Sequence, residues 1–212
     1  MVRSALIGKR FNEPFSEVVT TDGYEVRFLT SYMNFEEIYK EKKAVISDCG
    51  KYRYELHRQW DKDKDKVLFI MLNPSTADSH EDDLTTIRCV NFAKKWGYGG
   101  IMIGNIYPFR AKRPKDLRKW LKTPNNGLWE NRGSNISHVQ EMASKADRII
   151  CAWGCNYKDG VPDWIDELDS PVYCLELCKD GITPKHPLGN LSKDLKPIAY
   201  NALPQISGFY TN

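Results

Sequence analysis

The chain has 212 residues, of which 41% are hydrophobic and 12% aromatic, and its formal net charge is +3. A chain of this composition buries a sizeable core, which excludes an intrinsically disordered protein. No apolar run approaches the roughly 18 residues of a membrane span, and no signal peptide opens the chain, so we expect a cytoplasmic protein without membrane contacts. The length predicts one α/β domain at 44–212, with an N-terminal extension at 1–43 that packs on this core.

The six cysteines lie within or beside apolar segments. We expect all of them to be buried free thiols in a reducing compartment. The pairs Cys151/Cys155 and Cys174/Cys178 have three-residue gaps, which miss the C-x₂-C spacing of zinc and iron–sulfur sites. The sequence therefore predicts no metal site and no cofactor.

Short elements are predicted before residue 60. Residues 24–29 alternate between apolar and polar side chains, as a half-buried strand does. Residues 34–43 are charged and predict a short helix. Two further strands are expected at 44–46 and 52–56, separated by a turn around Gly50.

From residue 67 onward, predicted strands alternate with predicted helices. Asp83 caps the first helix and Gly97 ends it, while Pro114 suits the first turn of the second. The expected strands are 67–72, 100–105, 148–153 and 172–177, and the expected helices are 84–96, 114–121, 131–146 and 163–168. Such alternation implies parallel pairing. The predicted fold class is therefore α/β, as a three-layer α/β/α sandwich with a mostly parallel central sheet.

Polar residues follow all four of these strands. Asn73 and Asp78 follow the first, Asn105 ends the second, Trp153-Gly154 ends the third, and His186 lies in the loop after the fourth. Open α/β sheets bind ligands at the carboxyl ends of their strands, so we expect these residues to line one cleft. Each also has a purely structural interpretation: an asparagine before proline forms turns, an aspartate caps them, and a lone loop histidine is usually a surface residue.

Familiar catalytic motifs are absent from the sequence. It contains no G-x-S-x-G, no G-x-x-x-x-G-K-[ST] and no G-x-G-x-x-G. The strand-end residues instead suit polar recognition and general acid–base or electrostatic chemistry.

Several segments between about 44 and 196 resemble a bacterial and phage family named for a domain of unknown function, DUF1643. The segments that carry this resemblance are AVISDCGKYRYEL, LFIMLNPSTAD, DDLTTIRC, KKWGYGG, CAWG and CLELCKDGITPKHPL. The family name implies no chemistry.

A more distant resemblance is to the uracil-DNA glycosylase superfamily, which has a parallel α/β/α fold. Asn73-Pro74 is similar to the Asn-Pro core of an early motif in its mismatch-specific branch, and Asn105 to a strand-end asparagine that pairs with the base. Trp153-Gly154 and His186-Pro187 are similar to its late Trp-Gly and His-Pro motifs, in the same order along the chain. The chain departs from the superfamily in lacking a glycine-rich continuation after Pro74 and a serine after Pro187.

The resemblance implies roles in cleaving an N-glycosidic bond to a base flipped out of the stack. Asn73 and Asp78 are expected to activate water or substrate. His186 is expected to stabilise the negative charge that develops on the departing base. Contacts with the base are expected from Asn105, Trp153 and, at the rim of the cleft, Arg88.

The segment 110–122, RAKRPKDLRKWLK, holds seven basic residues against one acid. Such a block attracts phosphate backbones, although a solvated helix face has the same composition. Contacts with a nucleic-acid backbone are expected from Arg110, Lys112, Arg113 and Lys115.

Four functions remain open from the sequence. The first is a DNA glycosylase-like hydrolase acting on uracil or a modified base, and the second is a transferase that modifies a flipped pyrimidine in DNA. The third is a non-catalytic nucleic-acid or nucleotide-binding module, and the fourth is an enzyme acting on a free nucleotide or small glycoside. The expected partner is thus DNA or a nucleotide substrate, and the basic block favours DNA. The sequence does not indicate an oligomeric state.

Overall fold

The structure is a computed structural model that describes residues 16–21, 24–29, 39–75, 77–157 and 159–200, with side chains from residue 39 onward. The chain divides into two compact units, residues 1–38 and 39–212. The first contains an antiparallel strand pair, β1 (Ser16–Thr21) and β2 (Tyr24–Leu29), and β2 coincides with the predicted strand. The packing of residues 1–43 on the core stays a prediction.

The second unit is built on a mixed sheet of seven strands. They are β3 (Glu41–Ile46), β4 (Arg53–Gln59), β5 (Lys66–Met71), β6 (Gly100–Asn105), β7 (Arg148–Cys151), β8 (Val172–Cys174) and β9 (Ile198–Ala199). Their order across the sheet is β3-β4-β6-β5-β7-β8-β9. The α/β fold class is therefore confirmed.

The four strands predicted from residue 67 onward pair in parallel, in the order β6-β5-β7-β8. The flanks differ from the prediction, because β3–β4, β4–β6 and β8–β9 are antiparallel. A mostly parallel sheet was thus the wrong expectation: the short turn between β3 and β4 allows a hairpin but no parallel crossover. β7 and β8 are also shorter than the predicted 148–153 and 172–177.

The described residues hold three α-helices, α2 (Leu84–Lys95), α3 (Pro114–Leu121) and α4 (Leu128–Ser144). The predicted starts at Leu84 and Pro114 are confirmed. The helix expected at 163–168 is a 3₁₀ helix, Asp163–Glu167. The helix expected at 34–43 is wrong at 41–43, which belong to β3, and its residues 34–38 lie outside the described residues.

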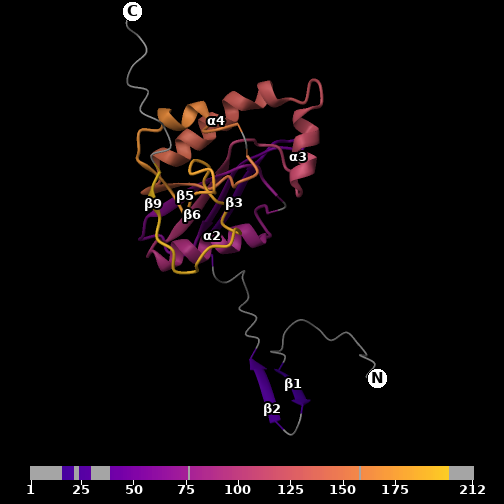
Figure 1. Ribbon diagram of the computed structural model, residues 1–212, viewed down its shortest axis with the longest axis vertical. Helices are drawn as coiled ribbons and strands as arrows, with labels where there is room; N and C mark the ends of the chain where they lie inside the picture. Colours follow the sequence, from indigo (N-terminus) through magenta and orange to yellow (C-terminus); the bar gives the residue numbers. More distant parts are fainter. Residues whose placement is uncertain (1–15, 22–23, 30–38, 76, 158, 201–212) are drawn as a thin grey trace, which may run out of the picture. The chain divides into compact units, whose positions relative to one another are not determined.

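Helices α2 and α4 pack on opposite faces of the sheet (Figure 1). Successive side chains of a strand point to opposite faces, and β5 is buried on both. Leu68 and Ile70 belong to the core cluster that contains Val139 and Met142 of α4. Phe69 instead stacks on Trp96 at the end of α2, with ring centroids 6.1 Å apart. No helix among the described residues is long and apolar enough to cross a membrane.

The cysteines correct one expectation. Cys155 and Cys178 form a disulfide, so not all six are free thiols. Of the free ones, Cys49 is exposed, whereas the other three are buried, as predicted: Cys89, Cys151 and Cys174. The spacing rule excluded a metal motif but carried no information about this pairing, which joins two loops 23 residues apart in the chain.

Candidate functional site

A cleft of about 730 Å³ lies at the carboxyl ends of the parallel strands, beside the first turn of α2. Its size is typical of small-molecule sites. Asn73 after β5, Asn105 at the end of β6, Gly154 after β7 and His186 in the loop after β8 all line it. The structure therefore brings together one residue from each of the four predicted strand-end segments.

Asn73 has a structural role as well as a place in the cleft. Its Nδ2 donates hydrogen bonds to the backbone carbonyls of Pro74 and Ala111, both at 2.9 Å. These bonds tie the end of β5 to the loop that follows β6. Oδ1 accepts no hydrogen bond from the described residues, so only this oxygen is free for a ligand or water.

Asn105 is buried at the base of the cleft, with 1% of its surface exposed. Its backbone carbonyl accepts a hydrogen bond from Nδ2 of Asn135 on α4, at 2.9 Å. Its own Nδ2 has no acceptor among the described residues. A buried donor without a partner costs free energy, and a ligand carbonyl in the cleft would remove that cost.

His186 is held as a neutral imidazole. Its Nδ1 accepts a hydrogen bond from the backbone N–H of Leu188 at 3.1 Å, which leaves the proton on Nε2. Burial lowers the pKa of His186, and the nearby carboxylate of Asp83 opposes this only in part. The neutral Nε2–H therefore serves as a hydrogen-bond donor at physiological pH.

Gly154 allows the backbone to approach His186 closely. Its φ is +88°, and a Cβ at this position would lie 3.0 Å from Cβ of His186. Its N–H also donates to the carbonyl of Pro184 at 2.9 Å. The Trp-Gly and His-Pro segments thus fit together because residue 154 lacks a side chain.

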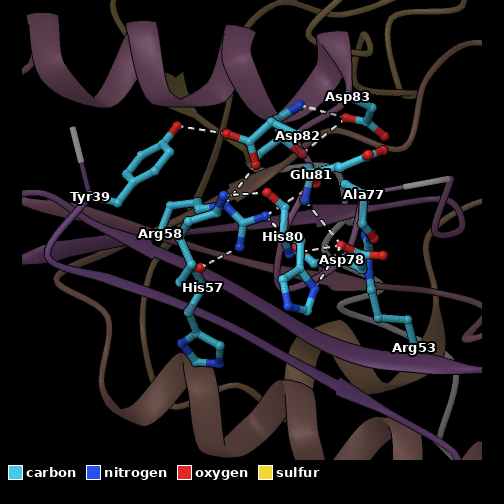
Figure 2. Close-up of polar contacts among 12 residues, drawn as sticks. Tyr39, Arg53, His57, Arg58, Ala77, Asp78, His80, Glu81, Asp82 and Asp83 are labelled. Atoms are coloured by element: carbon cyan, nitrogen blue, oxygen red, sulfur yellow. Dashed lines mark hydrogen bonds and ion pairs between the residues drawn. The ribbon is translucent and has the colours of Figure 1, made fainter. Parts of the chain in front are cut away.

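Arg58 anchors the loop that leads into α2 (Figure 2). The guanidinium is fully buried, and its Nε donates to Oδ1 of Asp82 at 2.6 Å. Its Nη2 donates to the backbone carbonyls of Asp78 and Glu81. The other oxygen of Asp82 accepts from the hydroxyl of Tyr39 at 2.8 Å. These bonds fix the loop that delivers the next residue, Asp83, to the cleft.

Two of the residues predicted for catalysis or base contact, Asp78 and Arg88, are not among those that line the cleft. Oδ1 of Asp78 accepts hydrogen bonds from the backbone N–H groups of His80 and Glu81, so its carboxylate caps a turn. These bonds lower its pKa. Arg88 donates to the carbonyl of Leu191 at 2.9 Å and fastens that segment to α2.

Trp153 lines the cleft, but only 2% of its surface is exposed. Its indole packs edge-on against Tyr157 and Tyr200, with centroids 6.2 and 5.8 Å away. Its Nε1 has no acceptor among the described residues. Trp153 therefore contributes to the wall of the cleft and offers no exposed ring face for stacking.

Sequence reasoning missed three charged residues of the cleft, Arg53, Asp82 and Asp83. Asp83 was predicted only as the cap of α2, which it is: Oδ1 accepts from the N–H of Thr86 at 2.8 Å. Arg53 is 3% exposed, and burial lowers its pKa to about 10, so it stays protonated at neutral pH. Its position in an alternating polar stretch gave no sign of burial.

The basic segment begins at the mouth of the cleft. Lys112 and Pro114 line it, whereas Arg110, Arg113 and Lys115 do not. Lys112, Arg113 and Lys115 are exposed. Arg113 is paired with Asp116, with Nε to Oδ2 at 2.8 Å. The exposed basic residues of segment 110–122 thus lie beside the cleft, whereas Leu117 and Trp120 on the other face of α3 are buried.

A second polar cluster lies outside the cleft, between β4 and α4. Both oxygens of the buried Glu55 carboxylate are bonded, one to Nδ1 of His138 at 2.5 Å and the other to Nε2 of His57 at 2.6 Å. Ligand atoms of Glu55, His138 and Glu141 lie within 4.8 Å of one another. Lys43, 3.7 Å from Glu55, supplies a positive charge that compensates this carboxylate.

Comparison with known proteins identifies a family but no individual protein. No curated protein and no solved structure matches the chain. A family model described as "Protein of unknown function (DUF1643)" matches residues 53–188, which is more than half of the chain and runs from Arg53 to Leu188, both of which line the cleft. The chain therefore belongs to the DUF1643 family of proteins of unknown function.

Proposed function

We propose that the cleft binds a nucleobase flipped out of DNA and that the protein is a DNA glycosylase-like hydrolase of the N-glycosidic bond of uracil or a modified base. One observation carries the proposal: two buried or half-buried hydrogen-bond donors that have no partner among the described residues, Nδ2 of Asn105 and Nε2 of His186, belong to the same strand-end cleft. Pyrimidines with carbonyl groups present acceptors to such donors.

His186 has the protonation state that this chemistry needs. Cleavage of an N-glycosidic bond leaves negative charge on an oxygen of the departing base. A neutral Nε2–H donates to that oxygen without first losing or gaining a proton, and the donor is already fixed in place by the bond between Nδ1 and Leu188. Asn105 donates to a second carbonyl of the base and selects it by that contact.

Asp83 takes the role that the sequence suggested for Asp78. The carboxylate of Asp83 lines the cleft, and only its Oδ1 is used in capping α2. Its negative charge supports the positive charge that develops on the sugar, or it accepts a proton from the attacking water. Oδ1 of Asn73, which is free among the described residues, orients that water.

A three-layer α/β/α sandwich of the uracil-DNA glycosylase type is part of this proposal. Its support is the packing of α2 and α4 on opposite faces and the order of the four motif segments around one cleft. The exposed basic residues of 112–122 beside the cleft support DNA as the partner.

A non-catalytic nucleotide-binding module is the second candidate. It is favoured by Asp78, whose carboxylate caps a turn, and by Asn73, whose Nδ2 is fully used by backbone carbonyls. A module of this kind would keep the base contacts of Asn105 and His186 but would release no base.

The test is a base-release assay on single-stranded and duplex oligonucleotides that carry uracil or modified pyrimidines. Asp83→Asn keeps a good helix cap and removes the charge, and His186→Phe removes the donor. We expect His186→Phe to lower the rate about 10²- to 10³-fold. Asp78→Asn is the matched control and should leave the rate near that of the wild type. Binding of a base-containing oligonucleotide without any release would select the binding module.

A further inference from the structure

Arg53 lies at the ligand-binding edge of the sheet because β4 runs antiparallel to its neighbour. Leu56 of β4 pairs with Ile103 of β6, so the first residue of β4 reaches the edge at which β6 ends. Arg53 is this first residue, and it lines the cleft with 3% of its surface exposed. The guanidinium of Arg53 therefore gives the buried part of the cleft a positive charge.

One edge of this guanidinium has no partner. Nη1 donates to the backbone carbonyl of Ala77 at 2.6 Å, whereas Nε has no acceptor among the described residues, and Arg53 has no ion pair there. The free edge, formed by Nε and Nη2, is the one that arginine uses to bind two oxygens of a phosphate or carboxylate at once. A buried cation with such an edge unused is costly unless a ligand occupies it.

The buried side-chain atoms of the cleft lining that have no partner among the described residues are all hydrogen-bond donors. Nδ2 of Asn105 and Nε1 of Trp153 are buried donors without acceptors among the described residues, and His186 presents an Nε2–H. Lys112 adds a second positive charge at the mouth. Asp82 and Asp83 also line the cleft, but Asp82 is paired with Arg58 and Asp83 caps α2. The cleft therefore suits a ligand that is rich in acceptors and whose anionic group lies at Arg53.

We propose that the free Nε/Nη2 edge of Arg53 binds the phosphate group of the nucleotide whose base contacts Asn105 and His186. The identity of the base rests on the function proposed above, whereas the phosphate site rests on Arg53 alone. The phosphate belongs either to a free nucleoside monophosphate or to the phosphodiester of a flipped nucleotide, since both present the same pair of oxygens to the fork.

The experiment is calorimetric titration of the full chain with 2′-deoxyuridine 5′-monophosphate, 2′-deoxyuridine, inorganic phosphate and a uracil-containing single-stranded oligonucleotide. We expect the monophosphate to bind at least about tenfold more tightly than the nucleoside, and Arg53→Met to abolish this difference. Arg148→Met is the matched control, because Arg148 also opens a strand, β7, but at the opposite edge of the sheet. It should leave the difference unchanged.

Arg53→Lys is a second variant, which keeps the proposal testable if Arg53→Met does not fold. It keeps the charge and loses the fork, so we expect intermediate affinity for the monophosphate and unchanged affinity for the nucleoside. Tighter binding of the oligonucleotide than of the monophosphate assigns the phosphate to DNA, and the reverse assigns it to a free nucleotide. Equal affinity of the wild type for nucleoside and monophosphate overturns the proposal, even if bases are released. Conversely, monophosphate binding through Arg53 without base release supports the phosphate site and contradicts the proposed glycosylase activity.

Discussion

Arg53 and Arg58 occupy the same strand, β4, and both are buried, but their hydrogen bonding differs. Arg58 uses its guanidinium on Asp82 and on three backbone carbonyls, whereas Arg53 donates from its side chain to one. Full use of the donors is what a structural arginine shows, and an unused fork is what a ligand-binding arginine shows before its ligand arrives. We therefore propose that Arg58 serves the stability of the fold and that Arg53, in the same strand, serves ligand binding.

Replacing Arg58 by Met should lower the free energy of unfolding by about 3–5 kcal/mol, because it leaves the largely buried carboxylate of Asp82 without its cation. Urea denaturation of the variant measures this loss. Arg53→Met should lower the free energy of unfolding by less, because Arg53 is an incompletely paired buried charge. A larger loss for Arg53→Met than for Arg58→Met would contradict these assignments.

Two histidines make stability depend on pH. Burial lowers the pKa of both His57 and His186 from 6.5, although nearby carboxylates oppose it. A lowered pKa means that the unfolded chain takes up protons first, so stability is complete above about pH 6.5 and falls as the pH drops through this value towards the folded-state pKa. Thermal unfolding between pH 5 and 8 tests this, and His186→Gln should flatten the slope. A stability that rises on acidification in this range would contradict it.

At the residue scale, the sequence predicted those positions whose location follows from the topology. Asn73, Asn105, Gly154 and His186 share the cleft because the ends of parallel strands meet. Arg53 was not predicted, since nothing in its surroundings, YRYEL, separates a buried polar residue from an exposed one. Asp78 and Asp83 lie in one acidic loop, and which of them enters the cleft depends on tertiary bonds that hold this loop, such as those of Arg58.

Among the elements, the disulfide between Cys155 and Cys178 joins the loop after β7 to the loop that leads to His186. It closes 23 residues of chain, for which the entropic gain is about 3 kcal/mol. The variant Cys155→Ala/Cys178→Ala should therefore be less stable by about that amount in urea denaturation. Addition of a reductant should lower the wild-type stability equally and leave the variant unchanged. Equal stability of variant and wild type under oxidising conditions would show that the bond is not formed.

Helix α3 offers the test of a DNA backbone contact. If Arg113 and Lys115 contact phosphates, changing both to Ala should weaken binding alike for all sequences and reduce the log–log salt slope by about 0.9 per lost contact on duplex DNA. Fluorescence anisotropy at several salt concentrations measures the slope. An unchanged slope would remove α3 from the interface and favour a free nucleotide.

Elements with a strong apolar signal were predicted well. β5 and β6 are wholly or nearly wholly buried, and their short apolar runs, ended by turn residues, favour strands over helices. β3 begins with Glu-Lys-Lys on an edge of the sheet, where charged residues are tolerated, so its first residues were mistaken for a helix. β9 consists of only two residues, both exposed, and is too short to show a periodic pattern in the sequence.

For the whole molecule, alternation of strands and helices predicted the α/β class and the parallel centre of the sheet. It did not predict that β3 and β4 add to one side of this centre in antiparallel fashion and β9 to the other. This addition matters for the proposed phosphate site, because only an antiparallel β4 places its first residue, Arg53, at the edge where the parallel strands end. The cleft therefore combines residues from four strand-end segments with one residue at the start of a strand.

The most direct test of the proposal that the cleft binds a nucleotide is a crystal structure of the protein with 2′-deoxyuridine 5′-monophosphate. It should show the base carbonyls within hydrogen-bonding distance of Nδ2 of Asn105 and Nε2 of His186, and the phosphate oxygens on the Nε/Nη2 edge of Arg53. A nucleotide bound elsewhere, with these three donors still unpaired, would contradict the account.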